Sequence, residues 1–250
     1  MASTATSTTA KRSATDDGST RPRKIRSSAA EAPKTGTRTI AVHVGKGHTK
    51  QTFDVYELSL VTHSEFFRAA ASERWKEGQE RTVSLPDDKP EYFEIFFNFL
   101  NGGQIFSSKA DDYIKEKNTD AEWARLLLCW VFGQKILSVT FKDAIVDAMV
   151  EKTKDGPHCT NLYTTPFDQS TPSKQLRKLL ADIVVYRFVP VDWKTATTQI
   201  TKYPEHLLDV ALALDGVKIQ GRAAMPPWAN NDCTYHEHVA DGTPCYKTLF

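Results

Sequence analysis

The sequence has few cysteines, no long apolar run and no large excess of charge of either sign. Four cysteines in 250 residues are too few for a disulfide framework, so reduced thiols are expected. No stretch approaches the about 18 apolar residues of a membrane-spanning helix, and the first ten residues lack the apolar segment of a secretory signal. A net charge of +1 gives no general attraction to an anionic membrane. We therefore expect a nuclear or cytoplasmic protein without a membrane partner.

Common catalytic motifs are also missing. The sequence has no Gly-x-Ser-x-Gly and no His-Glu-x-x-His. Residues 45–49 (GKGHT) contain a lysine between glycines. They lack the earlier glycine of a phosphate-binding loop, and no Ser or Thr directly follows the lysine, so a hairpin turn is predicted. The sequence therefore predicts no enzyme and no catalytic residue.

Residues 1–38 differ in composition from the rest of the chain. They contain 14 Ser or Thr and no aromatic residue, and such a segment cannot bury enough apolar surface to offset the entropy of ordering. Eight Lys or Arg against three Asp or Glu give this segment a charge of +5, which leaves −4 for residues 39–250. We expect a disordered basic Ser/Thr-rich tail at 1–38.

Two basic clusters lie in this tail, separated by ten residues. They resemble a bipartite nuclear import signal, in which positive patches on a flexible chain meet acidic grooves of a receptor. A solubilising tail and a weak contact with nucleic acid are the alternatives. The import candidates are Lys11, Arg12, Arg23, Lys24 and Arg26.

Residues 39–155 show the patterns of a folded domain. β-Prone runs predict strands at 39–44, 51–55 and 81–85, with a Gly-rich hairpin turn after the first. Helical periodicity predicts helices at 57–61, 64–71, 90–100, 120–132 and 139–152. We expect Gly78 to end the second helical region, a short edge strand at 104–106, and a loop at 111–119.

Residues 156–250 are expected to form a mainly helical region with an irregular Cys/His-containing tail. Apolar stripes predict helices at 176–184 and 204–214, the second with Leu207, Leu208, Ala211 and Leu212 inward. The chain after Gly216 is expected to be irregular, because it is rich in Gly, Pro and Asn. The predicted fold class is α+β, with a helical cluster on a small three-stranded sheet.

Several short segments in the first folded region follow one another in a specific order. They are Val42-His43-Val44-Gly45, Phe53-Asp54-Val55, Ser64-Glu65-Phe66-Phe67-Arg68-Ala69, Trp75-Lys76-Glu77-Gly78, Val83-Ser84-Leu85-Pro86-Asp87-Asp88 and Phe99-Leu100-Asn101-Gly102-Gly103. Together they resemble the BTB/POZ domain over residues 39–153. The chain departs from the family at Thr39 and Tyr56, where Asp and His are usual, and this divergence resembles the fungal branch.

The resemblance implies a protein-interaction module, an adaptor or scaffold. Members of the family dimerise, and some recruit a cullin-type ubiquitin ligase or transcription partners. We therefore expect protein partners, a second copy and a cullin scaffold among the candidates. The segment that some members exchange between subunits has no counterpart in residues 1–38.

The tail holds four residues with zinc-ligating side chains within thirteen positions: Cys233, His236, His238 and Cys245. Zinc favours four nitrogen and sulfur ligands in a tetrahedral set, and such a set would fix a tail that has little core of its own. A packed tail with free thiols and a disordered end are the alternatives. The alternative function is a nuclear regulator whose zinc-fixed tail contacts nucleic acid. The charge of −4 on residues 39–250 argues against this, because phosphate contacts need concentrated Lys and Arg.

Overall fold

The structure is a computed structural model that describes residues 36–72, 76–114, 119–155, 170–187, 203–220, 225–230 and 233–250. The five import candidates and the rest of residues 1–35 lie outside the described residues. None of the described helices is long and apolar enough to cross a membrane. The elements in chain order are β1 (Thr39–Val44), η2 (Gly47–Thr49), β2 (Gln51–Tyr56), α1 (Glu57–His63), α2 (Glu65–Ala70), α3 (Lys76–Glu80), β3 (Thr82–Leu85), α4 (Pro90–Gly102), β4 (Tyr113–Ile114), β5 (Thr119–Asp120), α5 (Ala121–Lys135), α6 (Val139–Lys152), α8 (Lys174–Arg187), α10 (Pro204–Gln220), η5 (Pro227–Asn230), α11 (His238–Asp241) and η6 (Tyr246–Thr248).

The three predicted strands form one sheet in the order β2-β1-β3. β1 and β2 are antiparallel neighbours joined by the predicted hairpin turn, in which Gly45 adopts a φ of 86° that favours glycine. β3 lies parallel to β1 on its other side, which requires the crossover through α1, α2 and α3. Alternate residues Ile40, Val42 and Val44 are buried, so one face of the sheet packs on the core.

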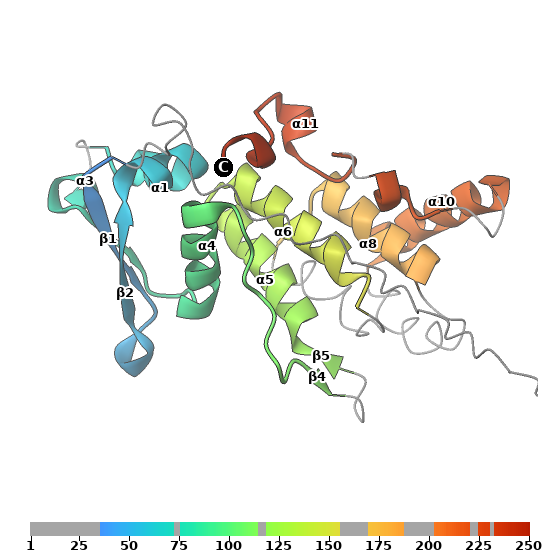
Figure 1. Cartoon of the computed structure of the whole chain (residues 1–250), viewed down its shortest axis with the longest axis horizontal. Coiled ribbons are helices and arrows are strands. Elements are labelled where there is room, and N and C mark those ends of the chain that lie inside the picture. Colours follow the sequence, from blue (N-terminus) through green and yellow to red (C-terminus); the bar gives the residue numbers. More distant parts are fainter. Residues whose placement is uncertain are drawn as a thin grey trace, which may run out of the picture. The chain divides into compact units, whose positions relative to one another are not determined.

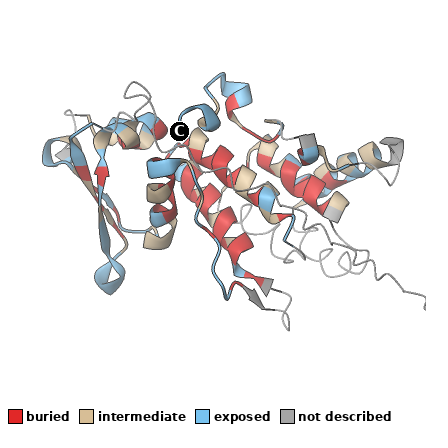
Figure 2. Ribbon diagram, viewed as in Figure 1, coloured by how far each residue is buried: buried red, intermediate tan, exposed pale blue. Residues whose placement is uncertain are grey.

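Helices α4, α5 and α6 form the centre of the core and lie side by side (Figure 1). The helix predicted at 90–100 is confirmed as α4, and its Phe93, Phe96 and Phe99 are all fully buried. Phe96 makes an edge-to-face contact with Phe141 of α6, with ring centroids 5.1 Å apart. Figure 2 shows the buried residues concentrated on α5, α6 and α8. The α+β fold class, with its small three-stranded sheet and helical C-terminal region, is confirmed.

Side-chain caps fix the beginnings of the helices. Ser64 and Asp120 cap α2 and α5 by accepting hydrogen bonds from the backbone N–H groups of Phe67 and Glu122. Ser138 caps α6 in the same way. Pro90 opens α4, and Gly103 ends it in the left-handed conformation at a φ of 69°.

Three predictions in the first folded region are wrong, those for residues 104–106, 111–119 and Gly78. Residues 104–106 form no strand, because side chains of α5 hold the segment that follows: Arg125 donates to the carbonyl of Ser107, and Ser107 Oγ donates to Glu122 at 2.8 Å. The short strands β4 and β5 lie instead within and at the end of the predicted loop at 111–119.

Gly78 does not end the helical region but lies inside α3. A Cβ at this position would lie 2.2 Å from the carbonyl oxygen of Ser72. Glycine therefore allows α3 to approach the backbone at the end of α2 closely, which is a packing role that the local pattern does not reveal.

Two predictions for the C-terminal region are also wrong. Helix α10 continues beyond Gly216 to Gln220, so the residues directly after Gly216 are helical. The residues expected inward on α10 are exposed: Leu207, Leu208 and Leu212 are 47%, 60% and 65% exposed, and Ala211 is exposed as well. His206 and Val210 are buried instead. The physical reason is an ion pair between Arg177 of α8 and Asp209, which turns the other face of α10 toward α8.

Candidate metal centre and interaction groove

The four zinc-ligand candidates lie together in the structure. Each offers one ligand atom, and these atoms all lie within 4.8 Å of one another. His236 and His238 are buried, while Cys233 and Cys245 are half-buried. The last two ligands adjoin short helical segments, since His238 begins α11 and Cys245 directly precedes η6. The tail therefore folds so that residues twelve positions apart in the sequence converge on one point.

Two aspartates of α6 orient the histidine rings. His238 Nδ1 lies 2.7 Å from Asp143 Oδ2, and His236 Nε2 lies 2.9 Å from Asp147 Oδ1. Positions four apart share one face of a helix, so α6 presents both carboxylates to the tail. A carboxylate on one ring nitrogen fixes the orientation and tautomer of a histidine whose other nitrogen binds a metal.

The remaining ring nitrogens fit a metal. His236 Nδ1 is buried and has no hydrogen-bond partner in the described structure, a condition that is costly unless a ligand satisfies the atom. In His238, Nδ1 is hydrogen-bonded to Asp143, so Nε2 is the ring nitrogen that could bind a metal. Two imidazole nitrogens and two sulfurs form the closed donor set that structural zinc prefers. The coarse prediction, a Cys₂His₂ group that could hold a metal, is therefore confirmed by the geometry.

The two thiols would repel each other as thiolates. Burial raises the pKa of Cys233, and the neighbouring Cys245 raises it further. A divalent cation between the sulfurs reverses this preference, because it stabilises both thiolates at once. Without a cation the raised pKa favours the neutral thiol of Cys233, so a metal bound here would have to displace its proton.

The aspartates also join the tail to α6. Asp143 accepts backbone hydrogen bonds from Glu237 and His238 at 2.7 and 3.3 Å. Asp147 accepts from Tyr246 Oη at 2.6 Å and pairs with Lys247 at 2.8 Å. Burial alone would raise the pKa of Asp147, but the hydrogen bonds from His236, Lys247 and Tyr246 lower it to about 2. Each carboxylate therefore serves both a histidine ring and the backbone or side chains of the tail.

The end of the tail packs on the aromatic core. The ring of Phe250 stacks on His63 with centroids 5.1 Å apart, and it meets the edge of Phe99 at 5.1 Å. It also covers Gly103, where a Cβ would lie 2.7 Å from the Phe250 ring. In Figure 1 the C-terminus accordingly lies near α1, α4 and α6.

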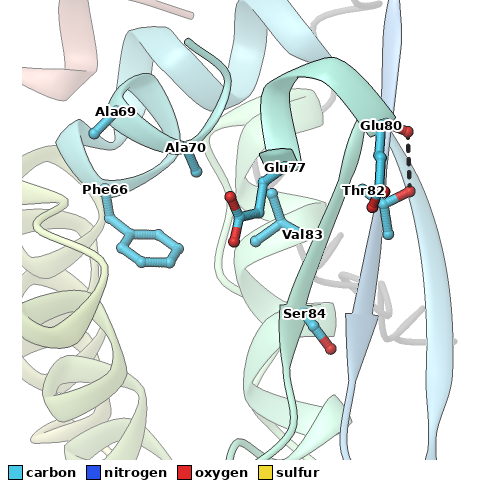
Figure 3. A pocket seen from close by; sticks show the side chains of 8 residues that line it. All are labelled: Phe66, Ala69, Ala70, Glu77, Glu80, Thr82, Val83 and Ser84. Carbon is cyan, nitrogen blue, oxygen red and sulfur yellow. Dashed lines mark hydrogen bonds between the residues drawn. The ribbon is translucent and has the colours of Figure 1, made fainter. Parts of the chain in front are cut away.

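A second candidate site lies beside β3. A cavity of about 450 Å³ is bounded by α2, α3 and β3 and is open to solvent. In Figure 3, Phe66, Ala69 and Ala70 lie on one side and Val83 and Ser84 on the other, with the carboxylate of Glu77 between them. The floor is therefore mainly apolar, and the acidic groups at the rim come from Glu77 and Glu80.

The outer edge of β3 adjoins this cavity. Ala41 N donates to Arg81 O and Gly45 N donates to Leu85 O, both at 3.0 Å, so alternate backbone groups of this segment face β1. The backbone groups of Thr82 and Ser84 consequently point away from β1. Among the described residues, no strand pairs with this edge. An exposed strand edge beside an apolar cavity can accept an extended peptide.

Sequence reasoning identified the four ligand candidates but missed Asp143, Asp147 and the groove. The two aspartates carry a recognisable signal, because they stand four apart on a helix that is otherwise largely buried. The groove carries none, since its lining comes from three elements whose arrangement depends on the parallel placement of β3.

Comparison with models of known protein families gives no match, and a search of curated proteins gives none either. The functional proposal is therefore based on the residues and contacts of the two sites. It also uses the resemblance of residues 39–153 to the BTB/POZ domain.

Proposed function

We propose that the chain is a protein-interaction module of the BTB/POZ type, an adaptor or scaffold whose tail is fixed by a structural zinc ion. The observation that carries this proposal is the groove between α2, α3 and β3, which combines an apolar cavity with a free strand edge. The order of the elements, a hairpin, three short helices, a third strand and an aromatic helix, supports the resemblance.

The groove suits an extended segment of a partner protein. Such a segment can hydrogen-bond to the outward backbone groups of Thr82 and Ser84, as an added strand does. One apolar side chain of the partner then fills the cavity against Phe66 and Val83. The carboxylate of Glu77 favours a basic residue next to that apolar side chain.

The zinc ion would be held by Cys233 Sγ, Cys245 Sγ, His236 Nδ1 and His238 Nε2. It would supply no chemistry on a substrate, because four protein ligands close the coordination shell. Its role is to stabilise the tail, in which the bound ion replaces the apolar burial that a short irregular segment lacks.

Ala69→Glu tests the groove. The substitution places a charged side chain at the edge of the cavity without disturbing the core, because Ala69 is exposed. Partners that co-purify with the full chain should be lost from the variant and retained by Ala110→Glu, an equally exposed alanine elsewhere. A cullin among those partners would support the adaptor role. If partner recovery is the same for both variants, the groove is not the binding site.

The zinc assignment has its own test, Cys233→Ser with Cys245→Ser. The full-length wild type should purify with one bound zinc, and the double variant should lose it together with the protection of residues 233–250 from proteolysis. A wild type that binds no zinc would contradict the metal centre and leave the groove untouched. Tight, salt-sensitive binding of duplex DNA by the full chain that survives neutralisation of its basic clusters would instead favour the nucleic-acid alternative.

A further inference from the structure

Helix α10 exposes a leucine-rich face. Leu207, Leu208 and Leu212 are between 47% and 65% exposed, and Leu214 at the border of the face is 39% exposed. With Ala211, the first three form a stripe at helical spacing, which normally packs against other protein. An exposed apolar stripe of this kind indicates a binding surface.

The orientation of α10 is fixed by its contacts with α8. Arg177 binds Asp209 through two hydrogen bonds of 2.7 and 3.1 Å, and Val210 is 1% exposed. His206, on the same side, is fully buried. Rotating α10 to bury the leucines would break the ion pair and expose Val210. The leucines are therefore exposed because a better-anchored face of the helix is buried.

The leucine stripe is continuous with a groove between α8 and α10. A cavity of about 370 Å³ is lined by Ala181 and Tyr186 of α8 and by Leu212, Ala213 and Gly216 of α10, among others. Small residues on both helices leave room for the side chains of a third helix to enter between them.

The charged residues of the exposed face identify the partner. Glu205 and Asp215 are exposed near the two ends of the stripe, and neither forms an ion pair with the described residues. On the α8 side the groove is lined by Lys174 and Lys178, and Lys178 pairs with Asp182. We infer that α10 binds a basic amphipathic helix of a partner protein. The partner's leucine-type residues cover Leu207, Leu208 and Leu212, and its Lys or Arg residues lie beside the two carboxylates. A lipid surface fits less well, because the same carboxylates repel anionic head groups.

Two synthetic peptides test this inference with the full chain. One is a helical peptide with a single leucine stripe flanked by lysines, and the other has glutamate at every lysine position. Fluorescence anisotropy should show that the lysine peptide binds at least about tenfold more tightly. Leu208→Asn with Leu212→Asn should weaken its binding by about tenfold or more, because the central apolar contacts are lost.

Two further variants make the test specific. Glu205→Lys with Asp215→Lys should reverse the preference in favour of the glutamate peptide. Leu58→Asn, which changes a leucine of α1 that is 42% exposed, should leave lysine-peptide binding unchanged.

Several results would overturn the inference. Equal affinity for both peptides would show that Glu205 and Asp215 do not select a basic partner. Unchanged binding to the double leucine variant would show that the leucine stripe is not the binding surface. A wild type that dimerises through this face, with dimers lost in the leucine variant, would show that a second copy is the occupant. Binding to anionic vesicles rather than peptide would identify a membrane surface. The groove beside β3 is not involved, so Ala69→Glu should not affect peptide binding.

Discussion

The helical core and the C-terminal tail are stabilised by different interactions. In α4, α5 and α6, fully buried aromatic rings such as Phe96 and Phe141 contact one another and bury apolar surface. In residues 233–250, the buried groups are mainly polar: His236 and His238 are held by aspartates of α6, and two half-buried thiols lie beside them. The core can fold by burying apolar surface, whereas the tail is held mainly by polar contacts with Asp143 and Asp147 of α6.

This difference shows how a short irregular segment can be added to a domain. Residues 233–250 contain few large apolar side chains, and Phe250 at the end remains 49% exposed. Carboxylates of α6 link the two regions, since Asp143 and Asp147 belong to a helix of the core and accept hydrogen bonds from the tail. The core therefore supplies the carboxylates that orient both histidines of the candidate metal centre.

The largest effect is expected from a cavity in the core. Phe96→Ala should lower the free energy of unfolding by about 3–5 kcal/mol, because it removes a fully buried ring. Denaturant unfolding measures this loss. If the core and the tail are independent, Phe96→Ala should lower the free energy of unfolding by the same amount when both wild type and variant have been treated with a zinc chelator. Phe106→Ala, at a ring that is 62% exposed, should change stability by less than about 0.5 kcal/mol.

The pH dependence of stability tests the contact between core and tail at His63. Burial lowers the pKa of His63 from 6.5 to about 4. Its stabilising effect is therefore complete above pH 6.5 and is lost as the pH falls toward 4, because only the unfolded chain takes up the proton readily. Between pH 7 and pH 4.5 this amounts to about 2.5 kcal/mol.

His63→Phe should reduce the fall in unfolding free energy between these two pH values by that amount. The exposed His48→Phe serves as the control and should leave the fall unchanged. An identical pH dependence in His63→Phe and wild type would show that the ring is not kept neutral by burial.

The polar contacts between α6 and the tail are tested at Asp143. Asp143→Asn should weaken zinc binding by about tenfold to a hundredfold, because the neutral amide orients His238 less well and removes a charge beside the site. Competition with a chromogenic chelator measures the affinity. The exposed Asp111→Asn should bind zinc like the wild type. Equal zinc affinity in all three proteins would mean that α6 does not support the centre.

The smallest effect on stability is expected at Gly103, where Phe250 at the end of the tail packs on the core. Gly103→Ala should destabilise the protein by about 1–2 kcal/mol, because φ at Gly103 is 69° and a Cβ would meet the ring of Phe250. Gly102→Ala is the matched control, since nothing lies within 4 Å of its Cβ, and it should be neutral or slightly stabilising. Truncation of Phe250 should reduce the loss of stability caused by Gly103→Ala. It should not change the effect of Gly102→Ala on stability.

Much of the fold could be predicted from local patterns. The strands at 39–44 and 81–85 and the helix beginnings at Ser64, Pro90 and Asp120 follow from side-chain periodicity, capping and proline geometry, which act over a few residues. The four ligands in the tail could be recognised from their chemistry and close spacing. Helix α10 was predicted as a helix, but its buried face was assigned wrongly.

Sequence by itself determined most of the helices, the three strands of the main sheet and which side chains can bind a metal, because these depend on residue type and short spacing. Only the tertiary structure decided three matters. It brought Asp143 and Asp147 to the histidines, it placed β3 with a free edge beside Phe66, and it turned Leu208 and Leu212 of α10 outward. The physical reason is common to all three. Each depends on a contact between segments distant in sequence, such as Arg177 with Asp209, and no local pattern encodes such a contact.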